Sequence, residues 1–298
     1  MQIHDAAETA RLLAYPRLIA ALEEVLPAYQ RGEIVSPERL VVPVGGGAGM
    51  LLSMPCSAPD LIAHKLITIY NGNPSAGLPA LQGQVTCLDA TNGRALFVLD
   101  GPTVTARRTA AISMLGIQRL RPAPPRAALL IGIGAQARAH AEALLELFPG
   151  VRIAVQGRRA EAVRAFCDAL GGAVHPAGND AAASTEVVIA ATSSRQPVYD
   201  APARADCLVI GVGAYRLDMV EIGAPTITGS QIYVDDPVGA PVEAGDVAAA
   251  GTDWASVRPL ATALDTPPDF SRPVFLKSVG CAAWDLAACR AAQAAWGG

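Results

Sequence analysis

Two glycines that follow an apolar run carry the clearest chemical signal in the sequence. They belong to the stretch Gly132-Ile-Gly134-Ala-Gln-Ala137, which has the G-x-G-x-x-A form of a dinucleotide-binding fingerprint. Gly132 permits a tight turn, Gly134 lets the backbone approach a pyrophosphate, and Ala137 lets a helix pack closely on a strand. Because the stretch follows a predicted strand and opens a predicted helix, whose N-terminus attracts phosphates, it predicts a dinucleotide site. The residues expected to contact the cofactor there are Gly132, Gly134, Ala135 and Gln136.

The end of the next predicted strand indicates which nicotinamide cofactor is bound. An acidic residue at this place would bind the ribose hydroxyls of NADH, but the chain has Gln156-Gly-Arg-Arg159. A carboxylate repels a ribose 2′-phosphate, whereas a guanidinium group holds it through paired hydrogen bonds. We therefore expect Arg158 and Arg159 to favour NADPH over NADH. A pair of solvated surface arginines is the alternative interpretation.

The elements that position these residues alternate between strand and helix. Strands are predicted at Ala128–Ile133, Arg152–Val155, Val187–Ala191, Cys207–Val212 and Gln231–Val234. Helices are predicted at Ala137–Leu147 and Ala160–Leu170. This alternation is typical of a parallel, doubly wound sheet.

The first hundred residues have a different pattern, with short strands separated by Gly, Pro and Asn. These strands are predicted at Leu40–Val44, Met50–Met54, Leu66–Tyr70, Gln84–Leu88 and Ala95–Leu99. Short turns between successive strands, such as Asn92-Gly93, indicate an antiparallel sheet. Further helices are predicted after the capping box Asp5–Glu8 and at Pro16–Arg31, Thr103–Leu115 and Ser278–Ala295. The fold class is therefore α/β, and Arg121–Pro125 is expected to be a stiff linker between domains.

Composition and charge narrow the classes of partner. A net charge of −4 and a pI near 5.6 argue against nucleic acid or an anionic membrane as the main partner. The longest apolar runs are too short for a membrane span, and no signal peptide is visible. The six cysteines form no C-x-x-C pair, so we expect neither a metal site nor a disulfide framework. A cytoplasmic protein with a small-molecule partner is the expectation.

The sequence resembles the ornithine cyclodeaminase/mu-crystallin family. The matching motifs run in order over nearly the whole chain: His64-Lys-Leu66, Gly77-Leu-Pro79, Leu99-Asp-Gly101, Thr105–Ala110, Tyr233–Asp236, Glu243–Asp246 and Lys277–Gly280. The resemblance implies a substrate and dimerisation domain formed by residues 1–120 and 276–298 around a Rossmann domain at 121–275. It also implies a homodimer built from the N-terminal domain.

Five residues outside the fingerprint are further candidates, four of them through the resemblance and Thr192 through its place in the predicted sheet. Arg39 and Lys65 match the ligands of a substrate carboxylate, which needs a fork of donors or a compact cation. An ion pair with a nearby Asp or Glu is the alternative for Lys65. Arg108 matches an arginine that faces cofactor and substrate, while its neighbour Arg107 is expected to face solvent. Thr192 follows a predicted strand and is expected at the carboxyl edge of the sheet, where such folds bind ligands. Ser278 matches a position near the substrate, although a helix N-cap would explain it equally well.

One departure from the family pattern narrows the expected reaction. Where the cyclising deaminases have an Asp, this chain has Tyr215 in Gly211-Val-Gly-Ala-Tyr215. A phenol is a poor base at neutral pH, so cyclisation of ornithine is disfavoured unless another carboxylate such as Asp218 serves. The expected function is NADPH-dependent reduction of the cyclic ketimines Δ1-pyrroline-2-carboxylate and Δ1-piperideine-2-carboxylate. The catalytic residues would be Lys65, Arg39 and Arg108, with Lys65 as the candidate proton donor through water. The alternatives are an ornithine cyclodeaminase with bound NAD and a non-catalytic, NADPH-dependent binder of small ligands.

Overall fold

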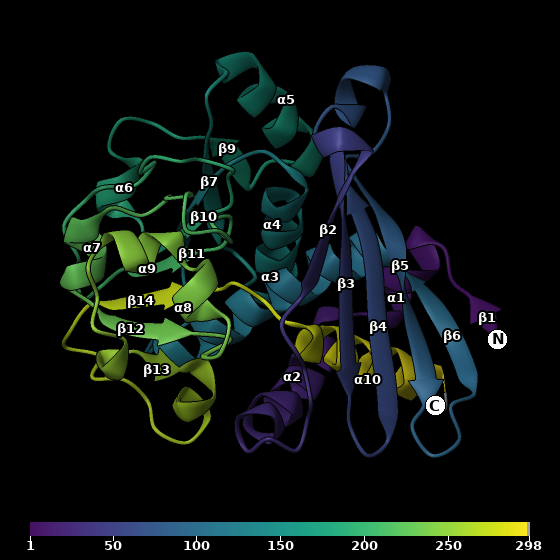
Figure 1. The fold of residues 1–298 in the computed structure, drawn as a ribbon. Helices are drawn as coiled ribbons and strands as arrows, with labels where there is room; N and C mark the ends of the chain where they lie inside the picture. Colours follow the sequence, from purple (N-terminus) through teal and green to yellow (C-terminus); the bar gives the residue numbers. More distant parts are fainter. Residues whose placement is uncertain (297–298) are drawn as a thin grey trace. The chain divides into compact units, whose positions relative to one another are not determined.

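The computed structural model describes residues 1–296 and shows two compact units (Figure 1). One unit comprises Met1–Arg108 and the segment from Cys281 onwards, and the other comprises Thr109–Gly280. The chain first crosses between them inside helix α3 (Gly101–Leu120), before the proline-containing linker. The functional assignment of the two parts of the chain stays a prediction.

The first unit contains a six-stranded sheet with the strand order β1-β6-β5-β4-β3-β2. Its strands are β1 (Gln2–Ile3), β2 (Leu40–Val44), β3 (Gly49–Ser57), β4 (Leu61–Ile69), β5 (Leu81–Asp89) and β6 (Ala95–Asp100). The predicted antiparallel pairing is confirmed for β2 to β6, including the β5–β6 hairpin that contains Asn92-Gly93. Sequence analysis missed β1, which pairs with β6 in the parallel direction and makes the sheet mixed.

Helices cover one face of this sheet. They are α1 (Ala6–Leu12), α2 (Tyr15–Gln30) and α10 (Ala282–Trp296), and α10 contacts β3, β4 and β5 (Figure 1). Asp5 caps α1 by accepting the backbone N–H of Glu8, as the predicted capping box requires. In β4 the residues Ala63, Lys65 and Ile67 alternate into the buried face, while Leu66 points to the opposite, partly exposed face.

The second unit is built on an eight-stranded, fully parallel sheet with the order β13-β12-β14-β11-β10-β7-β8-β9. The strands are β7 (Ala127–Ile131), β8 (Arg152–Gln156), β9 (Val174–Pro176), β10 (Val187–Ala190), β11 (Leu208–Gly211), β12 (Gln231–Val234), β13 (Arg258–Pro259) and β14 (Val274–Lys277). The helices are α4 (Ala135–Leu147), α5 (Ala160–Leu170), α6 (Ala181–Ser184), α7 (Ala224–Thr228), α8 (Ala240–Glu243) and α9 (Gly245–Ala249). The predicted doubly wound, Rossmann-type sheet is confirmed.

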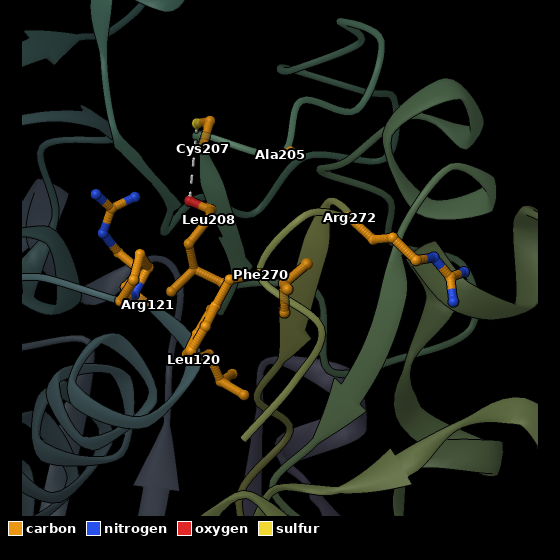
Figure 2. Close-up of a pocket in the computed structure, with 9 residues that line it drawn as sticks. Leu120, Arg121, Ala205, Cys207, Leu208, Phe270 and Arg272 are labelled. Carbon is orange, nitrogen blue, oxygen red and sulfur yellow. Dashed lines mark hydrogen bonds between the residues drawn. The ribbon is translucent and has the colours of Figure 1, made fainter.

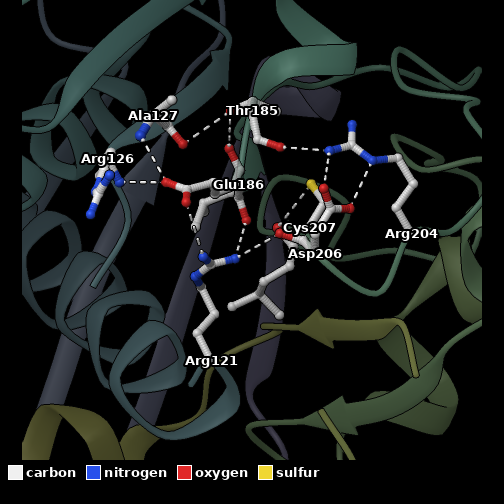
Figure 3. Close-up of polar contacts among 10 residues, drawn as sticks. Arg121, Arg126, Ala127, Thr185, Glu186, Arg204, Asp206 and Cys207 are labelled. Atoms are coloured by element: carbon white, nitrogen blue, oxygen red, sulfur yellow. Dashed lines mark hydrogen bonds and ion pairs between the residues drawn. The ribbon is translucent and has the colours of Figure 1, made fainter. Parts of the chain in front are cut away.

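The amino edge of the parallel sheet is closed by a polar network (Figure 3). Glu186, just before β10, accepts the backbone N–H groups of Arg126 and Ala127 at the start of β7. Arg121 donates to the backbone oxygens of Glu186 and Asp206 at 2.6 and 3.1 Å. The predicted linker therefore begins with a residue that is fixed to the sheet. The cavity beside it, shown in Figure 2, has a volume of about 10 Å³, which is room for one water molecule.

Candidate functional site

A cavity of about 720 Å³ opens at the carboxyl ends of β7, β8 and β10. Its walls come from the Gly132–Gln136 loop, from Gln156–Arg159 after β8, and from Ala191–Ser194 after β10. This is the edge of a parallel sheet at which such folds bind ligands, on both sides of the point where the strand order reverses. The residues predicted to bind the cofactor here, Gly132, Gly134, Ala135, Gln136, Arg158, Arg159 and Thr192, all line this one cavity. Arg108, also predicted to face the cofactor, belongs to the other unit.

The glycine loop fits a dinucleotide pyrophosphate. Gly132 has a φ of +121°, and a Cβ there would lie 2.5 Å from the backbone oxygen of Ala191. A Cβ on Gly134 would meet nothing within 4 Å, so that position faces open space. Gly134 is also the N-cap of α4 and brings no side chain to the first turn. The first N–H groups of α4 are therefore available to an anion.

Two cationic side chains stand at one wall of the cavity. Arg158 and Arg159 are exposed and follow β8, which ends at Gln156 rather than at an acidic residue. Neither arginine is paired with a carboxylate within the described residues 1–296. Their guanidinium groups are thus available to a phosphate at this wall.

A buried network of carboxylates, absent from the sequence analysis, shapes the loop that carries Thr192. Glu221 accepts the backbone N–H groups of Thr192, Gly213 and Ala214, and so joins the ends of β10 and β11. Burial raises the pKa of Glu221, and the charge of Lys277 opposes this shift. Lys277 in turn pairs with Asp246 at 2.9 Å, with both side chains fully buried. Two of the matched motifs, Glu243–Asp246 and Lys277–Gly280, therefore contribute to this edge of the sheet.

Ser278 forms a hydrogen bond with a carboxylate and does not cap a helix. Its Oγ donates to Oδ2 of Asp235 at 2.9 Å, and the same carboxyl group accepts the backbone N–H groups of Val279 and Gly280. The last helix begins at Ala282 instead of the expected Ser278. The alternative role of Ser278 as an N-cap is therefore wrong, and its expected role near the substrate stays a prediction.

The first unit holds a second group of candidate residues around Lys65. The Lys65 side chain, 1% exposed, reaches Asp285 with Nζ–Oδ2 and Nζ–Oδ1 distances of 2.8 and 3.1 Å. Arg108 is also buried, and its Nε lies 3.5 Å from Oδ1 of Asp285. Burial, together with the charges of Arg108 and Arg39 and against the opposing effect of Asp285, lowers the pKa of Lys65 to about 8. The structure thus brings Lys65 and Arg108 together around one carboxylate, and places Arg39 close enough for its charge to act on Lys65.

Local packing explains how Arg108 comes to this place. Helix α3 begins directly after β6, and a Cβ on Gly101 would lie 2.8 Å from the backbone of Gly83 and Gln84. This close approach fixes the direction in which the helix leaves the sheet. Arg107 does not face solvent as expected, because its Nε donates to the backbone oxygen of Leu13 at 2.8 Å and its guanidinium covers the Tyr15 ring.

The ion pair considered as the alternative for Lys65 is present, and its partner Asp285 was not identified from the sequence. The available signal was one acidic residue in an otherwise apolar, alanine-rich helix. Asp285 is 0% exposed and lies in the first turn of α10, where the helix dipole favours a negative charge. An ion pair does not exclude ligand binding by Lys65, because an ammonium has three donors.

The loop after β11 carries the residue that departs from the family pattern. Tyr215 is exposed there and cannot supply a carboxylate. Asp218 forms ion pairs with Arg195 and Arg216 at 3.2 and 2.9 Å, at the surface. Its carboxylate is engaged by two guanidinium groups, and this pairing weighs against Asp218 as a substitute base.

Both the sequence and the structure match known proteins. The sequence model of the ornithine cyclodeaminase/mu-crystallin family matches residues 1–263. A Delta(1)-pyrroline-2-carboxylate reductase 2 of Burkholderia ambifaria is 53% identical over 97% of this chain and 94% of that protein. A Delta(1)-pyrroline-2-carboxylate/Delta(1)-piperideine-2-carboxylate reductase of Azospirillum brasilense is 52% identical over 98% and 94%. The structure of a Thermococcus litoralis Delta(1)-pyrroline-2-carboxylate reductase, solved with NADH and L-proline, matches with a TM-score of 0.88 at 23% identity, over 99% of this chain and 97% of that one.

Proposed function

The chain belongs to the ornithine cyclodeaminase/mu-crystallin family, and on this premise we propose that it is an oxidoreductase that uses NAD(P)H to reduce cyclic ketimine carboxylates. The proposed substrates are Δ1-pyrroline-2-carboxylate, which yields proline, and Δ1-piperideine-2-carboxylate, which yields pipecolate. Relatives of those names at 53% and 52% identity over nearly the whole chain support this choice.

The observation that carries the proposal is the excess of positive charge around Lys65. Two buried cations, Lys65 and Arg108, lie there beside the carboxylate of Asp285, and the charge of Arg39 also acts on Lys65. Buried charge is costly unless it is balanced, so this group is suited to take up one more anion. A substrate carboxylate supplies that anion. The same argument weighs against substrates without an acidic group.

The residues then have the following roles. Arg39 and Lys65 bind the substrate carboxylate, which fixes the ring and the direction of its C=N bond. Arg108 lies beside the same aspartate, and the family resemblance implies a role for it toward cofactor and substrate. The bound nicotinamide supplies the hydride for the imine carbon, so the protein has to deliver only a proton to the imine nitrogen. Lys65 delivers that proton through a water molecule and regains it from solvent, because an ammonium with a pKa of about 8 is charged at neutral pH and acidic enough to donate.

Three finer statements belong to the same proposal. NADPH is preferred over NADH, because Arg158 and Arg159 line the cavity where a ribose 2′-phosphate would be held. The protein is a homodimer built from its first unit, because one face of the six-stranded sheet exposes apolar side chains. It works in the cytoplasm, a proposal supported by six buried cysteines that form no disulfide within residues 1–296. No helix of the described residues is long and apolar enough to cross a membrane.

The test is an absorbance assay of NADPH oxidation with each of the two cyclic imines. We expect turnover with both, and no ammonia from ornithine. Lys65→Ala should lower kcat/KM by about 100-fold or more, as expected for the loss of contacts worth about 3 kcal/mol to a charged ligand. Tyr215→Phe should keep most of the activity, because its hydroxyl has no proton-transfer role in this mechanism.

Ornithine separates this proposal from the cyclodeaminase alternative. Cyclisation must release ammonia and needs a group that shuttles protons near neutral pH, whereas Tyr215 is a phenol and Asp218 is held by two arginines. If the unmodified protein converts ornithine to proline and ammonia at a useful rate, the proposed reaction is wrong. Binding of a ring carboxylate without NADPH oxidation by any imine would instead support the non-catalytic binder.

A further inference from the structure

One buried carboxylate in the first unit has no part in the mechanism described so far. Asp285 is fully buried in helix α10 and contacts two cations from two other elements, Lys65 on β4 and Arg108 on α3. It lies in the first turn of its helix, where the helix dipole stabilises a carboxylate ion. Its Oδ1 accepts a hydrogen bond from Lys65 and lies 3.5 Å from Nε of Arg108, so one carboxylate attracts both cations.

Lys65 needs such a partner to stay charged. A lysine that is 1% exposed pays a large desolvation cost in its ammonium form, and the neighbouring charges of Arg108 and Arg39 increase this cost. Asp285 is the group that opposes these effects. The thiols of Cys56 and Cys289 also interact with Asp285, but they are neutral, because burial raises the pKa of Cys56 to about 12 and the hydrogen bond with Cys87 and burial raise that of Cys289.

We propose that Asp285 is a positioning residue for the imine reduction, which holds the Lys65 ammonium charged and directs it toward the substrate carboxylate. The inference rests on the proposed function and adds a residue to which neither the family resemblance nor the comparisons assign a role. Asp285 acts through Lys65 and Arg108 and does not itself touch the substrate.

The geometry explains why one carboxylate serves two cations. Oδ1 of Asp285 accepts a hydrogen bond from Lys65 Nζ at 3.1 Å, and Oδ2 lies 2.8 Å from the same nitrogen as an ion-pair contact, which together fix the ammonium on the helix side of β4. Lys65 keeps a third donor direction for the substrate. The neighbouring Arg108 Nε is 3.5 Å away, so Asp285 attracts it without a short hydrogen bond. Asp285 balances only one of the neighbouring positive charges, so the site can still bind a substrate carboxylate.

The test is the pH profile of kcat/KM for Δ1-piperideine-2-carboxylate in the unmodified protein and in Asp285→Asn. In the unmodified protein the activity should fall above a pH of about 8, where Lys65 loses its proton. Removing the opposite charge should move this alkaline limb down by about 1 to 3 pH units. Ionisation of the substrate is common to both proteins, so the difference between the profiles reports on Lys65. A purely structural loss would lower the activity at every pH and leave the limb in place, which would overturn the proposal.

A matched control and a conservative variant guard against simple misfolding. Asp60→Asn removes another aspartate that pairs with α10, through Arg290 at 2.7 Å, but at the protein surface; its alkaline limb should not move. Asp285→Glu keeps the charge, so it should keep the limb within about half a pH unit of the unmodified protein while raising KM. If Asp285→Asn cannot be purified in a folded state, the Asp285→Glu variant decides. An alkaline limb displaced in Asp285→Glu as far as expected for Asp285→Asn would show that the negative charge of residue 285 does not hold Lys65 charged.

A binding measurement separates failure of this inference from failure of the proposed function. Calorimetry with NADPH and pyrrole-2-carboxylate, a planar ring carboxylate that cannot be reduced by hydride addition to a ring imine, reports on the charge of Lys65 without turnover. Its affinity should fall above the same alkaline limb, and this limb should lie lower in Asp285→Asn. If no imine is reduced but this pH dependence holds, only the reaction is wrong. If imines are reduced and the two proteins bind the carboxylate with identical pH dependence, the role of Asp285 is wrong.

Discussion

Arg158 and Arg159 are the single residues to which the proposed preference for NADPH is assigned. Both are exposed at the cavity wall after β8, and neither has a carboxylate partner in the described part of the chain. A free guanidinium gains little from water-exposed neighbours but gains a charge-assisted, paired hydrogen bond from a phosphate. In the proposed function, the discrimination between two cofactors that differ by one phosphate therefore falls on these two side chains.

Replacing both arginines by alanine should weaken NADPH binding by about one to a few kcal/mol and leave NADH binding nearly unchanged. The measurement is a fluorescence titration of each reduced cofactor against each protein. Arg152→Ala, an exposed arginine at the start of β8 and thus at the opposite edge of the sheet, is the matched control and should bind both cofactors normally. Equal affinity of the unmodified protein for NADPH and NADH would refute the assignment.

Single residues also mark the limit of what the sequence could predict. The fingerprint glycines, Arg158 and Arg159 were predicted as one group because a local motif requires them to be neighbours, and they line one cavity. The approach of Asp285 to Lys65 was not predicted, because 220 residues separate them in the chain and only the packing of α10 on β4 brings them together. A charged residue at a position predicted to be buried indicates that it has a partner, but the sequence does not identify that partner.

At the scale of elements, helix α4 is tied to α3 by a buried histidine. His140 receives or donates at both ring nitrogens, with Ser113 Oγ 2.9 Å from Nε2 and the Gln136 backbone oxygen 2.7 Å from Nδ1. The carbonyl oxygen can only accept, so Nδ1 carries the hydrogen and Nε2 accepts from the Ser113 hydroxyl. Burial lowers the pKa of His140 to about 4, and the bond to Gln136 opposes this shift only in part. The helix that presents the glycine loop therefore depends on a neutral imidazole.

We expect His140 to make the protein less stable in mild acid. Between its unfolded pKa of about 6.5 and its folded pKa of about 4, the unfolded chain binds a proton that the folded chain does not. Stability is therefore lost as the pH falls through this window, by up to about 3 kcal/mol. Urea unfolding at pH 7 and at pH 5 should show a larger loss in the unmodified protein than in His140→Gln, whose side chain does not titrate. Equal losses in the two proteins would contradict the role given to His140.

The bounds of strands and helices were predicted correctly where the sequence pattern is regular. A strand was missed where the apolar run is short and includes a charged residue. The strands β2 and β12 and the helix α5 have the predicted bounds, because each combines a regular pattern with clear flanking residues. Strand β14 was missed, although it lies between β11 and β12 in the sheet. It has only four residues and ends in Lys277, whose charge is explained by the buried Asp246. A lysine in a short apolar run argues locally against a buried strand, and the local sequence does not show the distant aspartate that neutralises it.

At the scale of the whole molecule, the uncovered face of the six-stranded sheet needs an explanation. Leu40 on β2 lies in register with Ser53 on β3, which lies in register with Leu66 on β4, so these side chains share one face. Leu40 is 60% exposed and Leu66 is 37% exposed, while the helices α1, α2 and α10 pack on the unit's other side. Strand β2 is also the end of the sheet, with one row of unpaired backbone groups. A second copy of the same face would cover such a surface with closed, twofold symmetry.

The unmodified protein should therefore sediment as a dimer at micromolar concentration, and Leu66→Lys should shift it to the monomer. A lysine in the centre of this face would place two like charges close together across a twofold interface and would bury them away from water. The same change on a partly exposed strand position should leave the separate chain folded, so the thermal unfolding of the variant should remain cooperative. Val242→Lys, at an exposed apolar position of the second unit, is the control and should stay dimeric. A monomeric unmodified protein would refute the dimer, whereas a dimeric Leu66→Lys would show that another surface forms it.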